Sequence, residues 1–197
     1  MAPQVVFVGA PGSGKSTIAA AVAKHFGLPH IDTDTLVEQR SGMSVSDVFV
    51  SQGESVFRQL ERVAVVDALG NDEAIVSLGG GAVINADTRK DLTKHRVAWL
   101  QVSLSDAATR AGLNQARPLL LGNVRATLAK LLDERTPWYA EVATKAFDTS
   151  ACAVDQVVEQ VVAWLSEASS APSGSDTSSD DSDRSVQSET AESRTVS

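Results

Sequence analysis

The stretch that decides the fold is Gly9-Ala-Pro-Gly-Ser-Gly-Lys-Ser16, which fits the phosphate-loop pattern GxxxxGK[ST] in full. An apolar run at residues 4–9 leads into it, and a segment with the spacing of a helix follows at residues 16–26. In such loops successive backbone N–H groups turn inward to touch phosphate oxygens, which leaves no room for Cβ atoms. The alternative is a glycine-rich connector without chemistry, which the match of both motif and context disfavours. The stretch therefore predicts a nucleoside triphosphate site.

The side chains of this loop have separate expected functions. Lys15 should reach the β- and γ-phosphates, and the Ser16 hydroxyl should hold one Mg²⁺ ion. The helix that starts near Lys15 adds the partial positive charge of its N-terminus to the cradle. The nucleotide-binding residues predicted in the loop are Gly12, Ser13, Gly14, Lys15, Ser16 and Thr17.

The rest of the chain alternates between short apolar runs and longer amphipathic ones. Strands are predicted at residues 4–9, 29–32, 74–78, 96–102 and 146–148. Helices are predicted at residues 16–26, 44–50, 55–69, 105–111, 124–134 and 155–167, with a short helix capped by Asn85 and a loop at 112–123. This alternation predicts an α/β fold with a parallel sheet covered on both faces. Function in such sheets is found at the carboxyl ends of the strands.

Composition limits the classes of function. The chain has 197 residues and a formal net charge of −8, which disfavours a basic nucleic-acid binder. A single cysteine excludes an internal disulfide, and no apolar run is long enough to span a bilayer. No basic segment typical of a secretory signal precedes the first apolar run. These features predict a cytoplasmic protein, a monomer, with no membrane or nucleic-acid partner.

The composition changes abruptly at Ala168. Residues 168–197 are rich in Ser, Asp and Glu, carry half of the net charge, and contain only Val186 and Val196 as large apolar residues. Such a segment cannot bury enough apolar surface to offset the entropy lost on ordering. We therefore expect one domain at residues 1–167 and a disordered tail at residues 168–197, inert rather than regulatory.

Polar residues and glycines follow two of the predicted strands. Asp32 and Asp34 lie beside the phosphate loop, where a carboxylate can order water on Mg²⁺ or accept a hydrogen bond from a substrate hydroxyl. One of them could instead cap a helix that begins at Thr33. Residues 79–81 are three glycines, which close approach of a ligand and a plain tight turn explain equally well.

Three arginines are candidates for binding anionic groups. Arg58 shares a helix face with Glu61, but it also has Glu54 at i,i+4, so a solvated ion pair is its structural explanation. Arg117 lies in the predicted loop and could close over a transferring phosphoryl group, and Arg135 follows the helix predicted at residues 124–134. The histidines show no metal-ligand spacing and are expected to be structural: His25, His30 and His95.

Together these segments resemble the shikimate kinase family over residues 1–167. The segments are GAPGSGKST (9–17), DTD (32–34), VFRQLE (56–61), LGGGAV (78–83), ARPLL (116–120) and ERTPWY (134–139). The resemblance implies a P-loop, nucleoside-monophosphate-kinase-like fold with a five-stranded parallel sheet between helices and a lid. It also implies transfer of the γ-phosphoryl group of ATP to the 3-hydroxyl of shikimate, a step toward chorismate and the aromatic amino acids.

The resemblance implies four substrate-binding residues. Asp34 would bind the ring hydroxyls and accept the proton of the attacking one, and Gly80 would offer its backbone N–H. Arg58 and Arg135 would bind the carboxylate, for which planar guanidinium groups suit bidentate pairing.

The resemblance also implies contacts on the nucleotide side. Arg117 would be the lid arginine that contacts the ATP phosphates, so that Lys15, Asp34 and Arg117 become the catalytic candidates. Asp32 would hold Mg²⁺ through water, and Arg110 would lie near the adenine. Residues 150–154, Ser-Ala-Cys-Ala-Val, depart from the family, which has a basic or Asn residue and often a Pro there. No adenine contact is therefore assigned to this segment.

Other functions share parts of the pattern. A kinase for gluconate or for a nucleoside monophosphate has the same loop and fold, but its acceptor site would differ at Arg58, Gly80 and Arg135. A non-catalytic nucleotide-binding protein is the alternative from another class. The presence of Lys15 and Asp34, together with Arg117, disfavours it.

Overall fold

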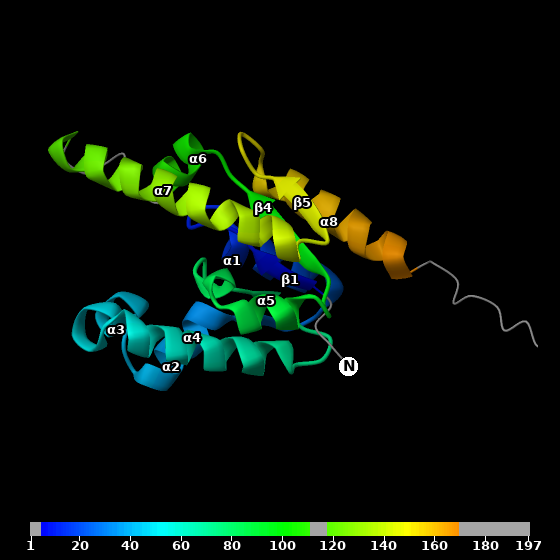
Figure 1. Cartoon of the computed structure of the whole chain (residues 1–197). Helices are drawn as coiled ribbons and strands as arrows, with labels where there is room; N and C mark the ends of the chain where they lie inside the picture. The colour runs from blue at the N-terminus through cyan, green and yellow to red at the C-terminus, as the bar shows by residue number, and fades with distance from the viewer. Residues whose placement is uncertain (1–4, 111–117, 170–197) are drawn as a thin grey trace, which may run out of the picture.

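A single five-stranded sheet forms the centre of the molecule (Figure 1). The computed structural model describes residues 5–110 and 118–169. The strands are β1 (Val5–Val8), β2 (His30–Asp32), β3 (Ile75–Ser77), β4 (Val97–Gln101) and β5 (Lys145–Asp148). Their order is β2-β3-β1-β4-β5, and every neighbouring pair is parallel. The predicted parallel α/β fold is thus confirmed, and the carboxyl ends of β1, β2 and β3 meet at one edge of the sheet.

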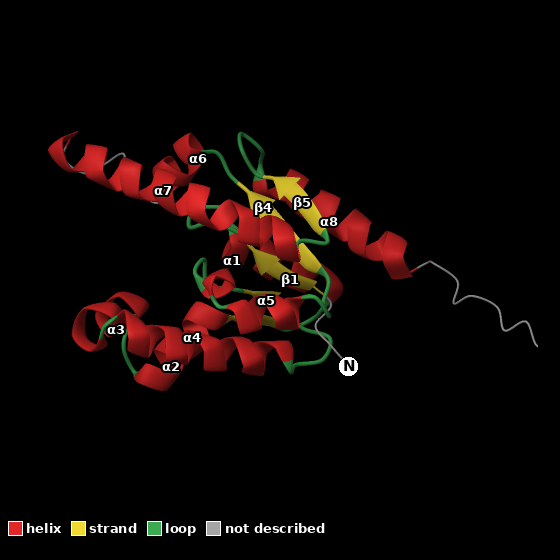
Figure 2. Cartoon of the chain, in the orientation of Figure 1, coloured by secondary structure: helices red, strands yellow, loops and turns green. Residues whose placement is uncertain are grey.

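Helices cover both faces of this sheet (Figure 2). They are α1 (Lys15–Phe26), α2 (Thr33–Ser41), α3 (Val45–Gln52), α4 (Glu54–Leu69), α5 (Ala86–Leu92), α6 (Leu104–Arg110), α7 (Pro118–Val142) and α8 (Val154–Ser169), with a 3₁₀ turn η1 (Ala82–Ile84). Helices α1 and α8 pack on one face, whereas α4, α5 and α7 pack on the other. Helices α2 and α3 pack against α4 in a smaller apolar cluster.

The central strand β1 explains why both faces are covered. Val5 and Phe7 belong to the core beneath α1 and α8, whereas Val6 and Val8 belong to the core beneath α4, α5 and α7. All four side chains are buried, because alternate residues of a strand point to opposite faces. A strand buried on both faces is therefore an uninterrupted apolar run rather than an alternating one.

Helix α7 is much longer than the sequence predicted. It begins at Pro118 and ends at Val142, so the prediction of a helix confined to residues 124–134 was wrong, and Arg135 lies inside the helix rather than after it. Pro118 occupies the first turn, where a missing N–H costs nothing. Gly122 and Asn123 lower helix stability by only about 1 kcal/mol each or less, which is too little by itself to end a long helix.

The segment after β2 resolves an alternative that the sequence left open. Helix α2 begins directly at Thr33, so Asp32 occupies its N-cap and Asp34 its first turn. The two carboxylates do not continue along an extended strand with period 2.

Two predictions concern residues whose structure is not described. Arg117 lies outside the described residues, as do residues 170–197 of the predicted tail. Helix α8 extends to Ser169. Among residues 5–110 and 118–169, no helix has both the length and the apolarity to cross a bilayer.

The packing of β3 predicts a large stability difference between two apolar truncations. Ile75 is fully buried in the core beneath α1 and α8, so Ile75→Ala should lower the free energy of unfolding by about 2–5 kcal/mol. Val50 on α3 is 88% exposed, and Val50→Ala should change it by no more than about 0.5 kcal/mol. Urea denaturation of both variants measures the difference. Similar losses in the two variants would contradict the assigned core.

Candidate active site

The phosphate loop between β1 and α1 lines a cavity of about 740 Å³. Gly12 has a left-handed φ of 79°, and a Cβ there would lie 2.8 Å from the carbonyl oxygen of Ala107. Gly14 has a φ of 85° and is the N-cap of α1, so the first N–H groups of the helix face the loop. The loop residues predicted to bind nucleotide all line this cavity: Gly12, Ser13, Gly14, Lys15, Ser16 and Thr17.

Lys15 is a partly buried cation at the start of α1. Its Nζ donates a hydrogen bond of 3.0 Å to the carbonyl oxygen of Ala10. Burial lowers the pKa of Lys15 to about 8, although the nearby charges of Asp34 and Asp32 act in the opposite direction. An ammonium group held at the mouth of an anion-binding loop with little water around it is well suited to attract phosphate oxygens.

Asp32 both caps α2 and holds Ser16. One oxygen, Oδ1, accepts hydrogen bonds from the backbone N–H groups of Asp34 (3.0 Å) and Thr35 (3.3 Å). The other oxygen, Oδ2, accepts from the hydroxyls of Ser16 (2.6 Å) and Ser77 (2.7 Å). Burial alone would raise the pKa of Asp32, but these hydrogen bonds outweigh it and lower the pKa. One carboxylate can therefore both cap α2 and accept a hydrogen bond from Ser16, the serine predicted to bind Mg²⁺.

The oxygen donors around Ser16 fit a Mg²⁺ ion. Because the Ser16 hydroxyl donates to Asp32, its lone pairs are free for a metal. Among the residues that the structure describes, no cluster of three or more His, Cys, Asp or Glu side chains could form a metal cage. Mg²⁺ is typically held by one or two protein oxygens, substrate phosphates and water, so the donor set present here suits it.

Asp34 lies in the first turn of α2, at the end of the cavity away from β5. Burial is the main cause that raises the pKa of Asp34, with help from the charge of Asp32, whereas the charge of Lys15 lowers it. A carboxylate with a raised pKa is a better proton acceptor than an exposed one. Asp34 and Gly80 both line the cavity, so the predicted hydroxyl-binding carboxylate and glycine are brought to the same place.

Arg58 is fixed on α4 by charges and aromatic rings. Its Nη1 donates to Oε2 of Glu61 (2.7 Å), and its Nη2 donates to Oε1 of Glu54 (3.1 Å). The guanidinium carbon lies 5.7 Å and 5.2 Å from the ring centroids of Phe49 and Phe57. The ion pair with Glu54 that offered a structural explanation is therefore present. The pair with Glu61 adds to it, since the Glu61 side chain is only 5% exposed and orients the guanidinium group.

Side chains closely approach the three glycines after β3. A Cβ on Gly79 would collide with the Asp34 carboxylate, and one on Gly81 would collide with the Arg58 guanidinium group. A Cβ on Gly80 would lie 3.1 Å from Cδ of Pro11 in the phosphate loop. The backbone of this turn, residues 79–81, is thus enclosed by the candidate site itself, which explains the glycines better than a generic turn does.

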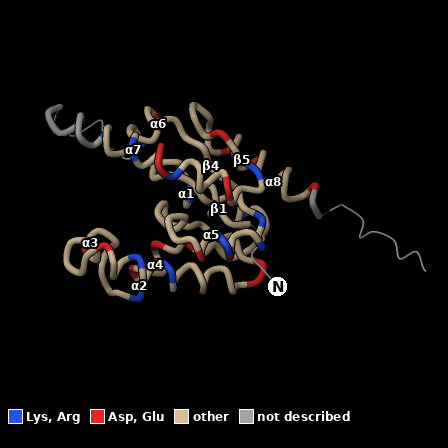
Figure 3. Tube along the Cα trace, in the orientation of Figure 1, with Lys and Arg blue, Asp and Glu red and all other residues tan. Residues whose placement is uncertain are grey.

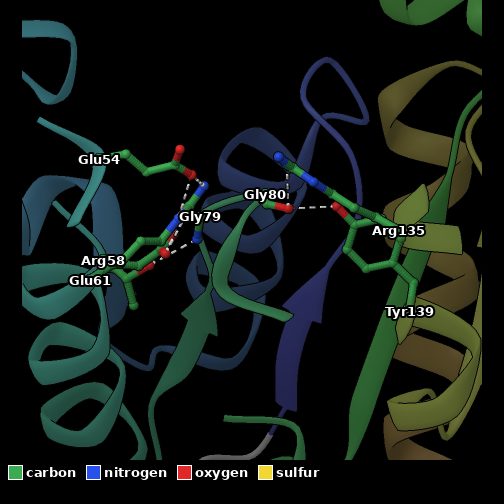
Figure 4. A network of polar contacts seen from close by, with 8 residues as sticks. Glu54, Arg58, Glu61, Gly79, Gly80, Arg135 and Tyr139 are labelled. Carbon is green, nitrogen blue, oxygen red and sulfur yellow. Dashed lines mark hydrogen bonds and ion pairs between the residues drawn. The ribbon is translucent and has the colours of Figure 1, made fainter. Parts of the chain in front are cut away.

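Helix α7 reaches the same turn from the opposite side (Figure 4). Nη1 of Arg135 donates a hydrogen bond of 3.0 Å to the carbonyl oxygen of Gly80, and the hydroxyl of Tyr139 donates one of 2.6 Å to the same oxygen. Burial raises the pKa of Tyr139 to about 12, so it remains a donor at neutral pH. Sequence reasoning missed Tyr139; its i,i+4 spacing from Arg135 was the available signal.

The charged groups of the site interact with one another. The charges of Asp34 and Arg135 both influence the pKa of Lys15, and the charges of Arg58, Asp34 and Arg135 all influence that of Glu61. Elsewhere along the described elements, basic and acidic residues are interspersed (Figure 3). The structure therefore brings the predicted residues Lys15, Asp34, Arg58 and Arg135 to one electrostatically connected place.

The other end of the cavity is lined by Arg110 and by residues that follow β5. Arg110, the last residue of α6, donates to the carbonyl oxygen (2.6 Å) and the hydroxyl (3.1 Å) of Thr149. The cavity wall continues through Cys152, Ala153, Val154 and Val157, so the segment that departs from the family pattern does line the site. Arg110 thus lies at the end of the cavity remote from Asp34, where a nucleotide base would be expected.

Comparisons with known proteins identify the family to which this chain is similar. The model of the family described as shikimate kinase matches residues 11–166. A shikimate kinase of Thermobifida fusca is 47% identical over 163 residues, which cover 83% of this chain and 95% of the relative. A shikimate kinase of Salinispora arenicola is 46% identical over 165 residues, which cover 84% of this chain and 99% of the relative.

The backbone of this chain is also similar to that of a solved shikimate kinase. The shikimate kinase of Acinetobacter baumannii in complex with shikimate superposes with a TM-score of 0.77 at 26% identity. The match covers 85% of this chain and 95% of that structure. The chain therefore belongs to the shikimate kinase family.

Proposed function

We propose that the chain transfers the γ-phosphoryl group of ATP to the 3-hydroxyl of shikimate, giving shikimate 3-phosphate and ADP. The observation that carries this proposal is the approach of two guanidinium groups, from α4 and from α7, to opposite sides of one glycine turn. Asp34 and the phosphate loop border the same turn. Such an arrangement offers cations for a carboxylate and an acceptor for a hydroxyl proton next to a triphosphate site.

The acceptor end of the site positions a small hydroxylated acid. Arg58 and Arg135 would bind its carboxylate, and the backbone N–H of Gly80 would bind another polar group. Asp34 would accept the proton of the attacking hydroxyl as the new O–P bond forms. Its raised pKa favours this proton transfer.

The nucleotide end holds the phosphates and stabilises developing charge. Lys15 would bind the β- and γ-phosphates together with the backbone N–H groups of residues 12–17, and Arg117 would add a lid contact to the phosphates. Ser16 and, through water, Asp32 would hold one Mg²⁺ ion, which neutralises charge on the phosphates. Arg110 would border the adenine. Positioning and charge stabilisation supply most of the catalysis in phosphoryl transfer.

The domain organisation and setting follow from the same assignment. The family match ends at residue 166, which supports a kinase domain at residues 1–167 with residues 168–197 as an appended segment. We infer that the kinase acts as a monomer, because one chain supplies every group named above. The use of ATP supports a cytoplasmic location.

Acceptor specificity tests the proposed reaction directly. ADP release in a coupled assay should rise at least about 100-fold when shikimate is added. The polar groups of the acceptor site are paired only by an acceptor that offers matching hydroxyl and carboxylate groups. Gluconate, AMP and a reaction without acceptor serve as comparisons, and each should give little ADP. Equal rates with and without shikimate would contradict the proposal.

The position of Arg58 predicts a selective loss of acceptor binding. Arg58→Ala should raise KM for shikimate about 10–100-fold, the loss expected for hydrogen bonds between charged groups, with little change in KM for ATP. Arg62 is the matched control, because it lies one turn later on α4 and pairs with Asp91 at 2.6 Å, away from the site. Arg62→Ala should leave both KM values unchanged. An unaltered shikimate KM in Arg58→Ala would remove Arg58 from the acceptor site.

The lowered pKa of Lys15 predicts an alkaline limit to activity. The ammonium form exists below about pH 8 and is lost above it, so kcat/KM for ATP should fall about tenfold per pH unit at higher pH. A guanidinium group stays charged in this range, so the residual activity of Lys15→Arg should lack this fall. A pH–rate profile of both proteins provides the measurement. The same fall in both would assign the titration to another group.

A further inference from the structure

A chain of hydrogen bonds connects His30 to the Ser16 hydroxyl. Nε2 of His30 lies 2.9 Å from Oγ of Ser77, and Oγ of Ser77 donates to Oδ2 of Asp32 at 2.7 Å. The same Oδ2 accepts from Oγ of Ser16 at 2.6 Å. His30 and Asp32 are the first and last residues of β2, and Asp32 stands in register with Ser77 on β3, so the strand pairing itself aligns these groups.

The direction of each proton in this chain follows from its members. An ionised carboxylate only accepts hydrogen bonds, so both serine hydroxyls direct their single proton to Asp32. The Ser77 oxygen can then only accept from the imidazole, which requires the proton of His30 to be on Nε2. The opposite arrangement, in which Ser77 donates to His30, would withdraw one of the two hydroxyl donors from Oδ2 of Asp32.

Because Ser77 is buried, loss of its hydrogen bond from His30 would cost free energy. Ser77 is fully buried in the sheet, whereas His30 is half-buried at its edge. Removal of the imidazole would leave the Ser77 oxygen without its N–H donor in a place that water does not reach. The Ser77 hydroxyl would then be less firmly directed at Asp32, and Asp32 would hold Ser16 less firmly.

We propose that His30 is a positioning residue for the Mg²⁺ site, because its Nε2–H group fixes Ser77 on Asp32 and thereby directs the lone pairs of Ser16 toward the metal. This proposal gives His30 a role beyond the structural one expected from the sequence. It rests on the proposed function only in that Ser16 binds Mg²⁺ beside a nucleotide.

Calorimetric binding of ADP with and without Mg²⁺ tests the proposal without turnover. His30→Leu removes the donor and should reduce the Mg²⁺-dependent gain in ADP affinity about fivefold, the loss expected for one hydrogen bond. ADP affinity without Mg²⁺ and KM for shikimate should be unchanged. His30→Gln keeps a side-chain N–H donor and should restore the gain to within about twofold of the unaltered protein.

His25→Leu is the matched control, since His25 is exposed near the end of α1 and packs edge-on against Phe26. It should behave as the unaltered protein. Equal loss of ADP affinity with and without Mg²⁺ in His30→Leu, or equal effects of Leu and Gln, would overturn the proposal.

A measurement on the unaltered chain keeps the proposal testable if His30→Leu fails to fold. Burial lowers the pKa of His30 below its usual 6.5, so the ring is neutral at about pH 8. Nitrogen NMR of labelled histidine should then show the Nε2–H tautomer for His30, and the Nδ1–H tautomer would overturn the proposal. Failure of shikimate phosphorylation would leave both measurements meaningful, because neither uses an acceptor.

Discussion

The close approach of charged side chains to bare backbone at residues 79–81 is the constraint on which the site depends. Asp34, Arg58 and Pro11 approach this turn so closely that a single added Cβ at each glycine would collide with one of them or lie unusually near it. Arg135 and Tyr139 hold the Gly80 carbonyl from α7. Four separate elements thus share one turn as their point of contact. The order of the parallel strands makes this possible, because β3 lies between β2 and β1 and its carboxyl end adjoins both Asp34 and the phosphate loop.

Several charged side chains around this turn have partners of opposite charge within the protein. Glu61 and Glu54 pair with Arg58, and burial of Glu61 raises its pKa while Arg58 lowers it. Lys15 and Asp34 are both partly buried, and each stabilises the charged form of the other. A buried cation without an anionic partner would lose its proton and its charge. A cation fully neutralised by carboxylates of the protein would no longer attract an anionic substrate. Lys15 lies between these limits, since its pKa remains close to physiological pH.

The fold could be predicted from the sequence, and most of the candidate site residues could be named, because the determining signals are local. The phosphate loop, the order of strands and helices, and the residues at strand ends are each visible within a short window. Contacts between segments far apart in the sequence could not be predicted. His30 contacts Ser77, 47 positions later in the chain, and Tyr139 contacts Gly80, 59 positions earlier. The length of α7 was underestimated because Pro, Gly and Asn were read as breakers, although Pro118 lies in the first turn, where it is tolerated. The three glycines left a close approach and a plain tight turn equally open, and they did not indicate that Arg58 and Asp34 approach the backbone.

Hydrogen-bond direction would explain how the proposed Mg²⁺ site works with so few protein ligands. A cage of carboxylates fixes a cation by geometry, but Ser16 contributes a single rotating hydroxyl. The lone pairs of this hydroxyl can face a metal only while its proton points away from the metal. The hydrogen bond to Asp32 keeps the proton in that direction. Asp32 accepts four hydrogen bonds at two oxygens, two from the backbone of α2 and two from hydroxyls, so rotation of its carboxylate would break several at once. The fixed orientation of the Ser16 hydroxyl therefore derives from the cap of α2 and the pairing of β2 with β3, which are features of the fold.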